Sequence, residues 1–150
     1  MRARDMAQPT EVIRLDTPAL DALRMLAESG QPGLVIAVDE SFVVVPASQV
    51  LRVALPRYVI DDAALGRVWD EPSADAIAAR LAGRTLADLA KALDPSRDEN
   101  RPDHVVDGEA NLVEIAAVMA AAHVPLVAVV DEGVLLGMIT VNQLIRSVLA

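Results

Sequence analysis

Two stretches of this chain are almost the same: Leu34–Glu40 is LVIAVDE and Leu126–Glu132 is LVAVVDE. The match extends toward the N-terminus without a gap, so that Leu20–Glu40 aligns with Leu112–Glu132 at a spacing of 92 residues. Six of the 21 aligned positions are identical, and most of the others stay apolar. Such a repeat predicts that one supersecondary unit has been duplicated and that the copies bury their apolar faces against each other.

Each copy is predicted to fold as strand, helix, strand, strand, helix. Asp16 or Thr17 is the expected cap of the first long helix, and Gly30 is its expected end. The strands that follow the long helices are wholly apolar, which is typical of strands buried on both faces. The remaining segments are strands at Val12–Leu15, Leu34–Val38 and Phe42–Val45 and a helix at Ser48–Leu55, then strands at His104–Val106, Leu126–Val130 and Val134–Ile139 and a helix at Asn142–Leu149.

These elements divide the chain into a first repeat (1–55), a helical segment (56–83) and a second repeat (84–150) of one compact unit. Expected helices between the repeated stretches are Ala63–Val68, Ser73–Leu81 and Thr85–Leu93, and Asp94–Asp103 is an expected loop. Tyr58 and Trp69 are expected to anchor packing in the core or at a subunit interface, with ligand stacking as the alternative.

Composition excludes several classes of function. The chain is 53% hydrophobic but only 2% aromatic, and it has no cysteine for a disulfide, a thiol nucleophile or a thiolate metal site. A net charge of −9 disfavours binding to nucleic acid, because its phosphates are also negative. The longest apolar run is too short to cross a membrane, and we expect a cytoplasmic protein. No phosphate loop, nucleophile motif or metal-ligand spacing is present, so neither an enzyme nor a required cofactor is expected.

The second copy carries an ordered series of family motifs. They are Arg84–Leu89 (RTLADL), Asn111–Ala116 (NLVEIA), Val124–Asp131 (VPLVAVVD) and Gly133–Thr140 (GVLLGMIT). Together with the duplication, this series resembles the CBS domain pair, also called the Bateman module. The resemblance covers nearly all of the chain except about residues 57–83. It implies an α/β fold in which two copies pack across a pseudo-twofold axis, with the helical segment inserted between them.

The resemblance also implies a regulatory module that binds an adenosine-containing ligand, such as AMP, ADP, ATP or S-adenosylmethionine, in clefts between the copies. Such a module would form a homodimer and signal to a separate effector protein. The first cleft would use Met138, Thr140 and Gln143 of the second copy and Ile13, Gln31, Pro32 and Gly33 of the first. The second cleft would use Val44, Pro46 and Gln49 of the first copy and Val105, His123, Val124 and Pro125 of the second.

The chain departs from the family pattern at the position of the aspartate that holds the ribose. Gln49 and Gln143 stand there, and Pro46 replaces the threonine in the first copy. Thr140 is therefore the better candidate for phosphate, and it is also an expected N-cap. The alternative function is a ligand-free dimerisation or protein-interaction module whose clefts have lost their nucleotides.

Overall fold

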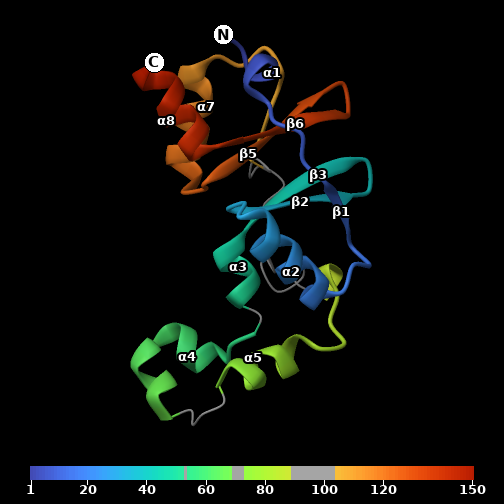
Figure 1. Cartoon of the computed structure of the whole chain (residues 1–150), viewed down its shortest axis with the longest axis vertical. Coiled ribbons are helices and arrows are strands. Elements are labelled where there is room, and N and C mark those ends of the chain that lie inside the picture. The colour runs from blue at the N-terminus through green and yellow to red at the C-terminus, as the bar shows by residue number, and fades with distance from the viewer. Residues whose placement is uncertain (53, 69–72, 89–103) are drawn as a thin grey trace.

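The computed structural model describes residues 1–52, 54–68, 73–88 and 104–150. Two three-stranded sheets lie face to face, and each carries helices on its outer side (Figure 1). The order along the long axis is helices, sheet, sheet, helices, with a further helical segment beyond the first copy. This arrangement confirms the predicted α/β fold with two tandem units.

The first copy contains the predicted strand, helix, strand, strand, helix. Its elements are β1 (Val12–Arg14), α2 (Ala19–Ser29), β2 (Gly33–Val38), β3 (Ser41–Pro46) and α3 (Ala47–Arg52). β1 pairs with β2 in parallel, and β2 pairs with β3 in antiparallel fashion. Ala22 and Leu26 of α2 pack on this sheet with Ile13 and Ile36, because residues four apart share one face of a helix.

The second copy repeats this topology. Its elements are β4 (Val105–Val106), α7 (Leu112–Ala122), β5 (Leu126–Asp131), β6 (Val134–Thr140) and α8 (Val141–Leu149). β4 is parallel to β5, and β5 is antiparallel to β6. Ile115 and Met119 of α7 fill a second core with Val127, Val129 and Ile139.

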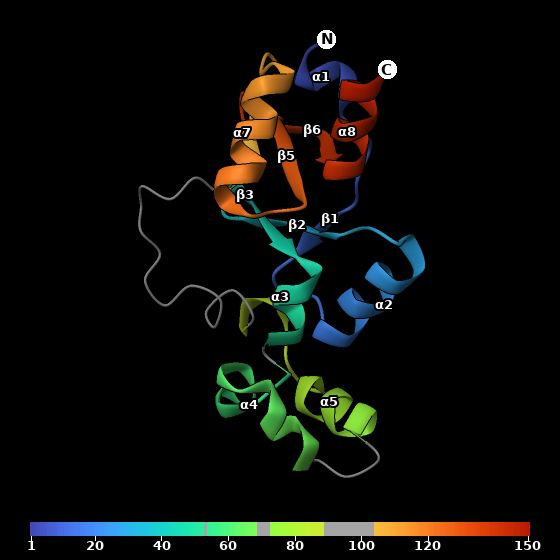
Figure 2. The same cartoon turned by 90° about the vertical axis from the view of Figure 1, so that its left-hand side faces the viewer.

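The inserted segment is helical, as predicted, but not in every detail. It holds α4 (Arg57–Asp61), η1 (Ala63–Val68) and α5 (Ser73–Leu81), which lie below α2 and α3 (Figure 2). The expected helix Ala63–Val68 is a 3₁₀ helix. The predicted α3 ends at Arg52 rather than at Leu55. Tyr58 is half exposed on α4; Trp69, the loop Asp94–Asp103 and the end of the helix expected from Thr85 lie outside the described residues.

The start of α2 corrects the predicted cap. Pro18 occupies the N-cap position, and neither Asp16 nor Thr17 caps the helix through its side chain. Asp16 instead pairs with Arg14 at 3.1 Å. The N–H of Ala19 donates to the backbone oxygen of Arg84 at 2.9 Å. A residue distant in sequence, rather than a local side chain, therefore satisfies this N–H group at the helix start. The predicted end at Gly30 is confirmed by its left-handed conformation, with φ of 67°.

The structural spacing of the repeat is 93 residues, and the spacing of 92 read from the sequence is wrong by one. The helix N-caps Pro18 and Asn111 and the left-handed C-caps Gly30 and His123 are the equivalent pairs. A slip of one residue would place exposed Glu114 opposite buried Ala22, and in a strand it would exchange the two faces. β6 has one extra residue at a bulge opposite Val129 and Val130, so the spacing between equivalent residues of the two copies is one longer after it.

The two sheets contact each other through a small apolar cluster. Its buried members are Val35, Val44, Leu126, Ala128 and Met138. A Cβ atom on Gly33 would lie 2.8 Å from Cδ2 of Leu126, which is the structural counterpart of Gly33 at a spacing of 93. A Cβ atom would come still closer, 2.6 Å, to the backbone oxygen of Val45 on the neighbouring strand, so glycine suits both the pairing within the sheet and the contact between the copies.

The segments that lead into the two copies are exchanged. α1 (Ala3–Met6) packs in the second core, where Ala3 and Met6 are buried. Leu81 and Leu86 instead fill the first core. The division of the sequence at residues 55 and 83 stays a prediction, but each core is completed by residues from outside its repeated stretch.

A connector, defined here as residues 7–11, joins the two sheets. The N–H of Gln8 donates to the Met138 oxygen and the N–H of Met138 donates to the Gln8 oxygen, both at 2.9 Å. Gly137 makes this pairing possible, because a Cβ atom there would clash with the carbonyl oxygen of Gln8. Its φ of 153° also disfavours any L side chain. The connector is thus fixed to β6 at one end and continues into β1 at the other.

We expect Gly137→Ala to lower the free energy of unfolding by about 1–3 kcal/mol, because it adds backbone strain and breaks the pairing with Gln8. Urea unfolding measures this change. Gly66→Ala is the matched control: its new Cβ would lie 3.6 Å from Cγ1 of Val59 and needs no unusual φ. Equal stabilities of the two variants would contradict this account of Gly137.

Candidate functional site

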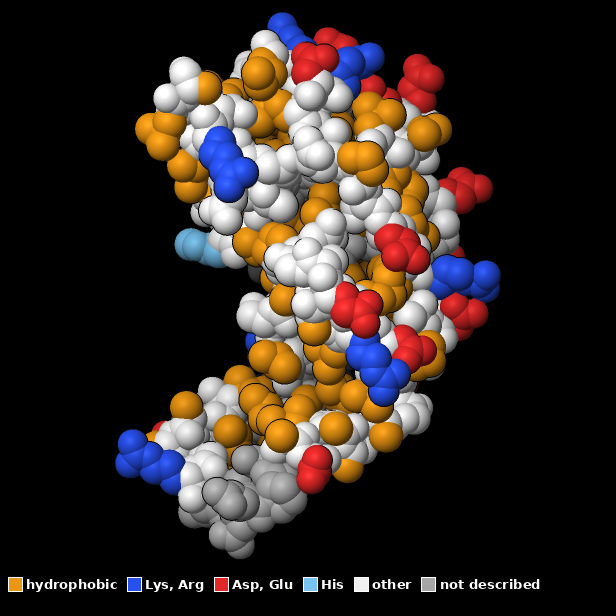
Figure 3. Space-filling model, viewed as in Figure 1, with side chains coloured by type: hydrophobic (Ala, Val, Ile, Leu, Met, Phe, Trp, Pro, Cys, Tyr) orange, Lys and Arg blue, Asp and Glu red, His pale blue; other side chains and the backbone are white. Residues whose placement is uncertain are grey.

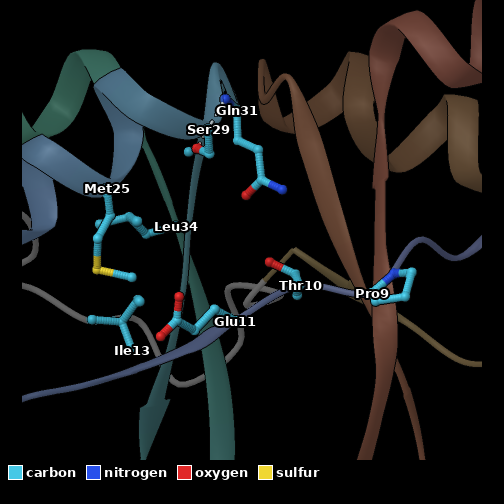
Figure 4. Close-up of a pocket in the computed structure, with 9 residues that line it drawn as sticks. Pro9, Thr10, Glu11, Ile13, Met25, Ser29, Gln31 and Leu34 are labelled. Atoms are coloured by element: carbon cyan, nitrogen blue, oxygen red, sulfur yellow. Dashed lines mark hydrogen bonds between the residues drawn. The ribbon is translucent and has the colours of Figure 1, made fainter.

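A pocket of about 290 Å³ lies between the connector and the first copy (Figure 4). This volume is near the lower end of the range for small-molecule sites, roughly 300–1,000 Å³. The lining residues come from three places: the connector, α2 with the turn after it, and strands β1 and β2. They are Pro9, Thr10, Glu11, Ile13, Met25, Ser29, Gln31, Gly33 and Leu34.

The turn after α2 sets the upper wall. Gly30 takes the left-handed conformation, and its N–H donates to the Leu26 oxygen at 3.0 Å. The N–H of Gln31 then donates to Oγ of Ser29 at 3.3 Å. These local bonds reverse the chain directly after the helix, so that the Gln31 carboxamide points down toward the connector (Figure 4).

The pocket has an apolar end and a polar end. Ile13, Met25 and Leu34 gather on one side, while Thr10 and Gln31 face each other on the other (Figure 4). The Glu11 carboxylate lies between these groups. An apolar surface with a few convergent polar groups is the usual composition of a small-molecule site.

Part of the predicted first cleft lines this pocket. Ile13, Gln31 and Gly33 do so, whereas the oxygen of Pro32 accepts a hydrogen bond from the N–H of Ala47 at 2.9 Å. The sequence reasoning missed Pro9, Thr10, Glu11, Met25, Ser29 and Leu34. The connector residues carry no motif. The available signal was their position between the lead-in at Arg4–Met6 and the strand at Val12.

The residues predicted from the second copy are not among those that line the pocket. Thr140 is the N-cap of α8, which confirms its expected capping role: Oγ1 accepts from the N–H of Gln143 at 3.3 Å. The Gln143 oxygen accepts from the Thr140 N–H at 2.8 Å and from its hydroxyl at 3.2 Å. Met138 is buried in the cluster between the sheets. Gln143 thus occupies the expected ribose position with its side chain turned back on Thr140.

The residues of the predicted second cleft have varied surroundings. Val44 is buried between the sheets and Val105 packs against the same cluster. Val124 is buried in the second core. The others lie at or near the ends of elements. Exposed His123 is the C-cap of α7, and the oxygen of Pro125 accepts from the N–H of Val141 at 2.8 Å. Pro46 ends β3, and half-buried Gln49 lies on α3.

Neither a metal cluster nor a membrane span is found within the described ranges. No group of three or more His, Cys, Asp or Glu side chains there is arranged to hold a metal ion. No described helix combines the length and apolar character needed to cross a membrane.

The comparisons that find a match for this chain find CBS-domain proteins. A protein-family model described as "CBS domain" matches residues 98–150. A CBS domain-containing protein of unknown function from Kribbella flavida is 39% identical, with a TM-score of 0.75, over 100% of this chain and 99% of that one. No protein in the curated collection matches the chain.

More distant structures share the fold. The CBS-pair protein CBSX2 from Arabidopsis thaliana is 22% identical with a TM-score of 0.67, over 99% of this chain and 94% of that one. A structure of CBSX2 in complex with AMP is also 22% identical, with a TM-score of 0.64, over 99% and 96% of the two chains. At this identity the likeness concerns the fold alone.

The capping bonds of Thr140 predict a stability effect. We expect Thr140→Ala to lower the free energy of unfolding by about 0.5–2 kcal/mol, because the N–H of Gln143 loses its acceptor, Oγ1 of Thr140. Combining it with Gln143→Ala should cost less than the sum of the single changes, since both remove the bond from the Thr140 hydroxyl to the Gln143 oxygen. Chemical unfolding of the three variants measures both effects.

Asn142→Ala is the control, because Asn142 is exposed in the same turn and its loss should change the stability by less than about 0.5 kcal/mol. Additive effects of Thr140 and Gln143 would contradict the reciprocal cap.

Proposed function

The chain belongs to the CBS domain family, and on that premise we propose that it is a regulatory module that binds an adenosine-containing ligand in the pocket beside the connector. The observation that carries the proposal is the composition of the pocket. Ile13, Met25 and Leu34 offer an apolar surface for a planar base, and Thr10, Ser29 and Gln31 offer hydrogen-bonding groups for a sugar. The AMP complex of the plant relative CBSX2 supports the same class of ligand.

The position of the pocket suits a sensor. Its wall is the connector, which bonds to β6 of the second copy at Gln8 and enters β1 of the first copy at Val12. A ligand seated there contacts a segment attached to both copies. If it binds one relative arrangement of the copies better than another, it shifts the population toward that arrangement. We propose that this shift is what a separate effector protein recognises.

Binding should be visible as thermal stabilisation of nucleotide-free protein. A compound at 100 times its dissociation constant adds roughly 2.7 kcal/mol, which raises the melting temperature by roughly 4 °C or more in a chain of this size. We expect at least one of adenosine, AMP, ADP, ATP and S-adenosylmethionine to give this shift. Ser29→Trp should abolish it, because the indole would fill the pocket.

Ala27→Trp is the matched control. Ala27 is exposed on the same helix and is not a lining residue, so the shift should survive there. A flat response to the whole panel, or an equal response from both tryptophan variants, would overturn the proposed site.

A specific asymmetry favours the alternative, assembly through a homodimer. On α7 and α8, Val113, Val148 and Leu149 are 72%, 59% and 79% exposed. Their structural counterparts in the first copy are Leu20, Ala54 and Leu55. Ala54 is 0% exposed and shares a core cluster with Leu81 of α5, while Leu20 and Leu55 are partly buried. Apolar side chains are visible on the surface around α8 (Figure 3). We propose that a second copy of the chain covers this face.

We expect the protein to sediment as a dimer and Val148→Glu to sediment as a monomer, because a charge on this face would be buried without a partner. Val134→Glu is the control, since Val134 is also exposed (61%) but lies on the hairpin away from α8. A monomeric wild-type protein at micromolar concentrations would rule out this dimer. A cytoplasmic location and the absence of catalysis stay predictions.

A further inference from the structure

The charge of the residues that line the pocket favours some adenosine-containing ligands over others. Of the nine residues that line it, Glu11 is the one with a formal charge, and no lysine, arginine or histidine is among them. We propose that Glu11 is the specificity-determining residue, and that it selects adenosyl compounds whose 5′ substituent is positive or uncharged over nucleotides that carry phosphates. This inference rests on the proposed function, because it concerns the same pocket.

Glu11 lines the pocket and extends its side chain near the apolar group (Figure 4). Its carboxylate lies between the apolar group of Ile13 and Leu34 and the polar pair of Thr10 and Gln31 (Figure 4). A nucleoside whose base lies on the apolar side and whose sugar meets the polar side would bring its 5′ substituent near this carboxylate. A carboxylate accepts hydrogen bonds from hydroxyls and pairs with cations, but it repels phosphate.

Three N–H groups at the starts of α8 and α3 already donate hydrogen bonds within the protein. At the start of α8, the N–H of Val141 donates to the Pro125 oxygen at 2.8 Å, and the N–H of Gln143 donates to Oγ1 of Thr140 at 3.3 Å. At the start of α3, the N–H of Ala47 donates to the Pro32 oxygen at 2.9 Å. A helix N-terminus attracts anions through N–H groups that lack partners, so these bonds weaken that attraction.

The charge of the whole chain acts in the same direction. At −9, the protein field disfavours the approach of a polyanion and favours a cation. S-Adenosylmethionine carries a sulfonium cation at the position where a nucleotide carries its first phosphate. The ligand class that fits the pocket is therefore an adenosyl sulfonium, followed by uncharged adenosine, with AMP and then ATP weaker.

Isothermal titration with S-adenosylmethionine, adenosine, AMP and ATP tests this order on wild-type protein, Glu11→Gln, Glu11→Lys and the control Glu28→Gln. Glu28 is an exposed acid on α2 that does not line the pocket. We expect Glu11→Gln to weaken S-adenosylmethionine about three- to tenfold and to leave adenosine within about twofold. Glu11→Lys should reverse the preference in favour of AMP. Glu28→Gln should match wild type.

The possible outcomes distinguish a failure of the proposed adenosyl site from a failure of the role proposed for Glu11. If no adenosyl compound binds wild-type protein, the proposed function fails, and this inference fails with it. If AMP or ATP binds more tightly than S-adenosylmethionine, or if the order is the same in wild type and Glu11→Lys, an adenosyl site stands but Glu11 does not determine its specificity. Raising the salt concentration should weaken binding of S-adenosylmethionine more than binding of adenosine.

Discussion

The two sheets pack directly against each other, and this contact decides where the connector and the pocket lie. Gly33 and Leu126 are structural counterparts, and they lie close together where the sheets meet. Val35, Val44, Ala128 and Met138 pack around this point in one buried apolar cluster. It holds β1, β2 and the connector at a fixed distance from β6. The pocket exists because the connector must cross from one sheet to the other beside this contact.

The two copies share a fold but differ in their contribution to the pocket and in how far their outer faces are covered. The first copy contributes most of the pocket, and its outer face is partly covered by the inserted helices. The second copy has a well-formed N-cap at Thr140 and an apolar outer face without cover within the described residues. If the proposed ligand site and the proposed dimer face are correct, this asymmetry places them on different copies, so that each can change without the other.

Sequence reasoning predicted the order of the elements well because apolar stretches such as Leu126–Val130 and stops such as Gly30 act locally. It failed where tertiary contacts decide. The cap of α2 is the backbone of Arg84, which no local pattern reveals. The repeat spacing was wrong by one because identities at Val38 and Asp39 outweighed the burial pattern. Three residues of the pocket were predicted, while Thr10 and Glu11 were missed because their importance comes from a crossing between sheets.

The exchanged lead-in segments set an order for folding during synthesis. The first core can close soon after Leu86 has been made, because its other members precede that residue. The second core needs Ala3 and Met6, the earliest residues of the chain, and they must wait until β6 has formed. Contacts between such distant parts of a chain are slow to form, since a long loop must close first. α1 therefore precedes β6 in synthesis but docks only after β6 has formed, so that the pocket gains its connector wall late in folding.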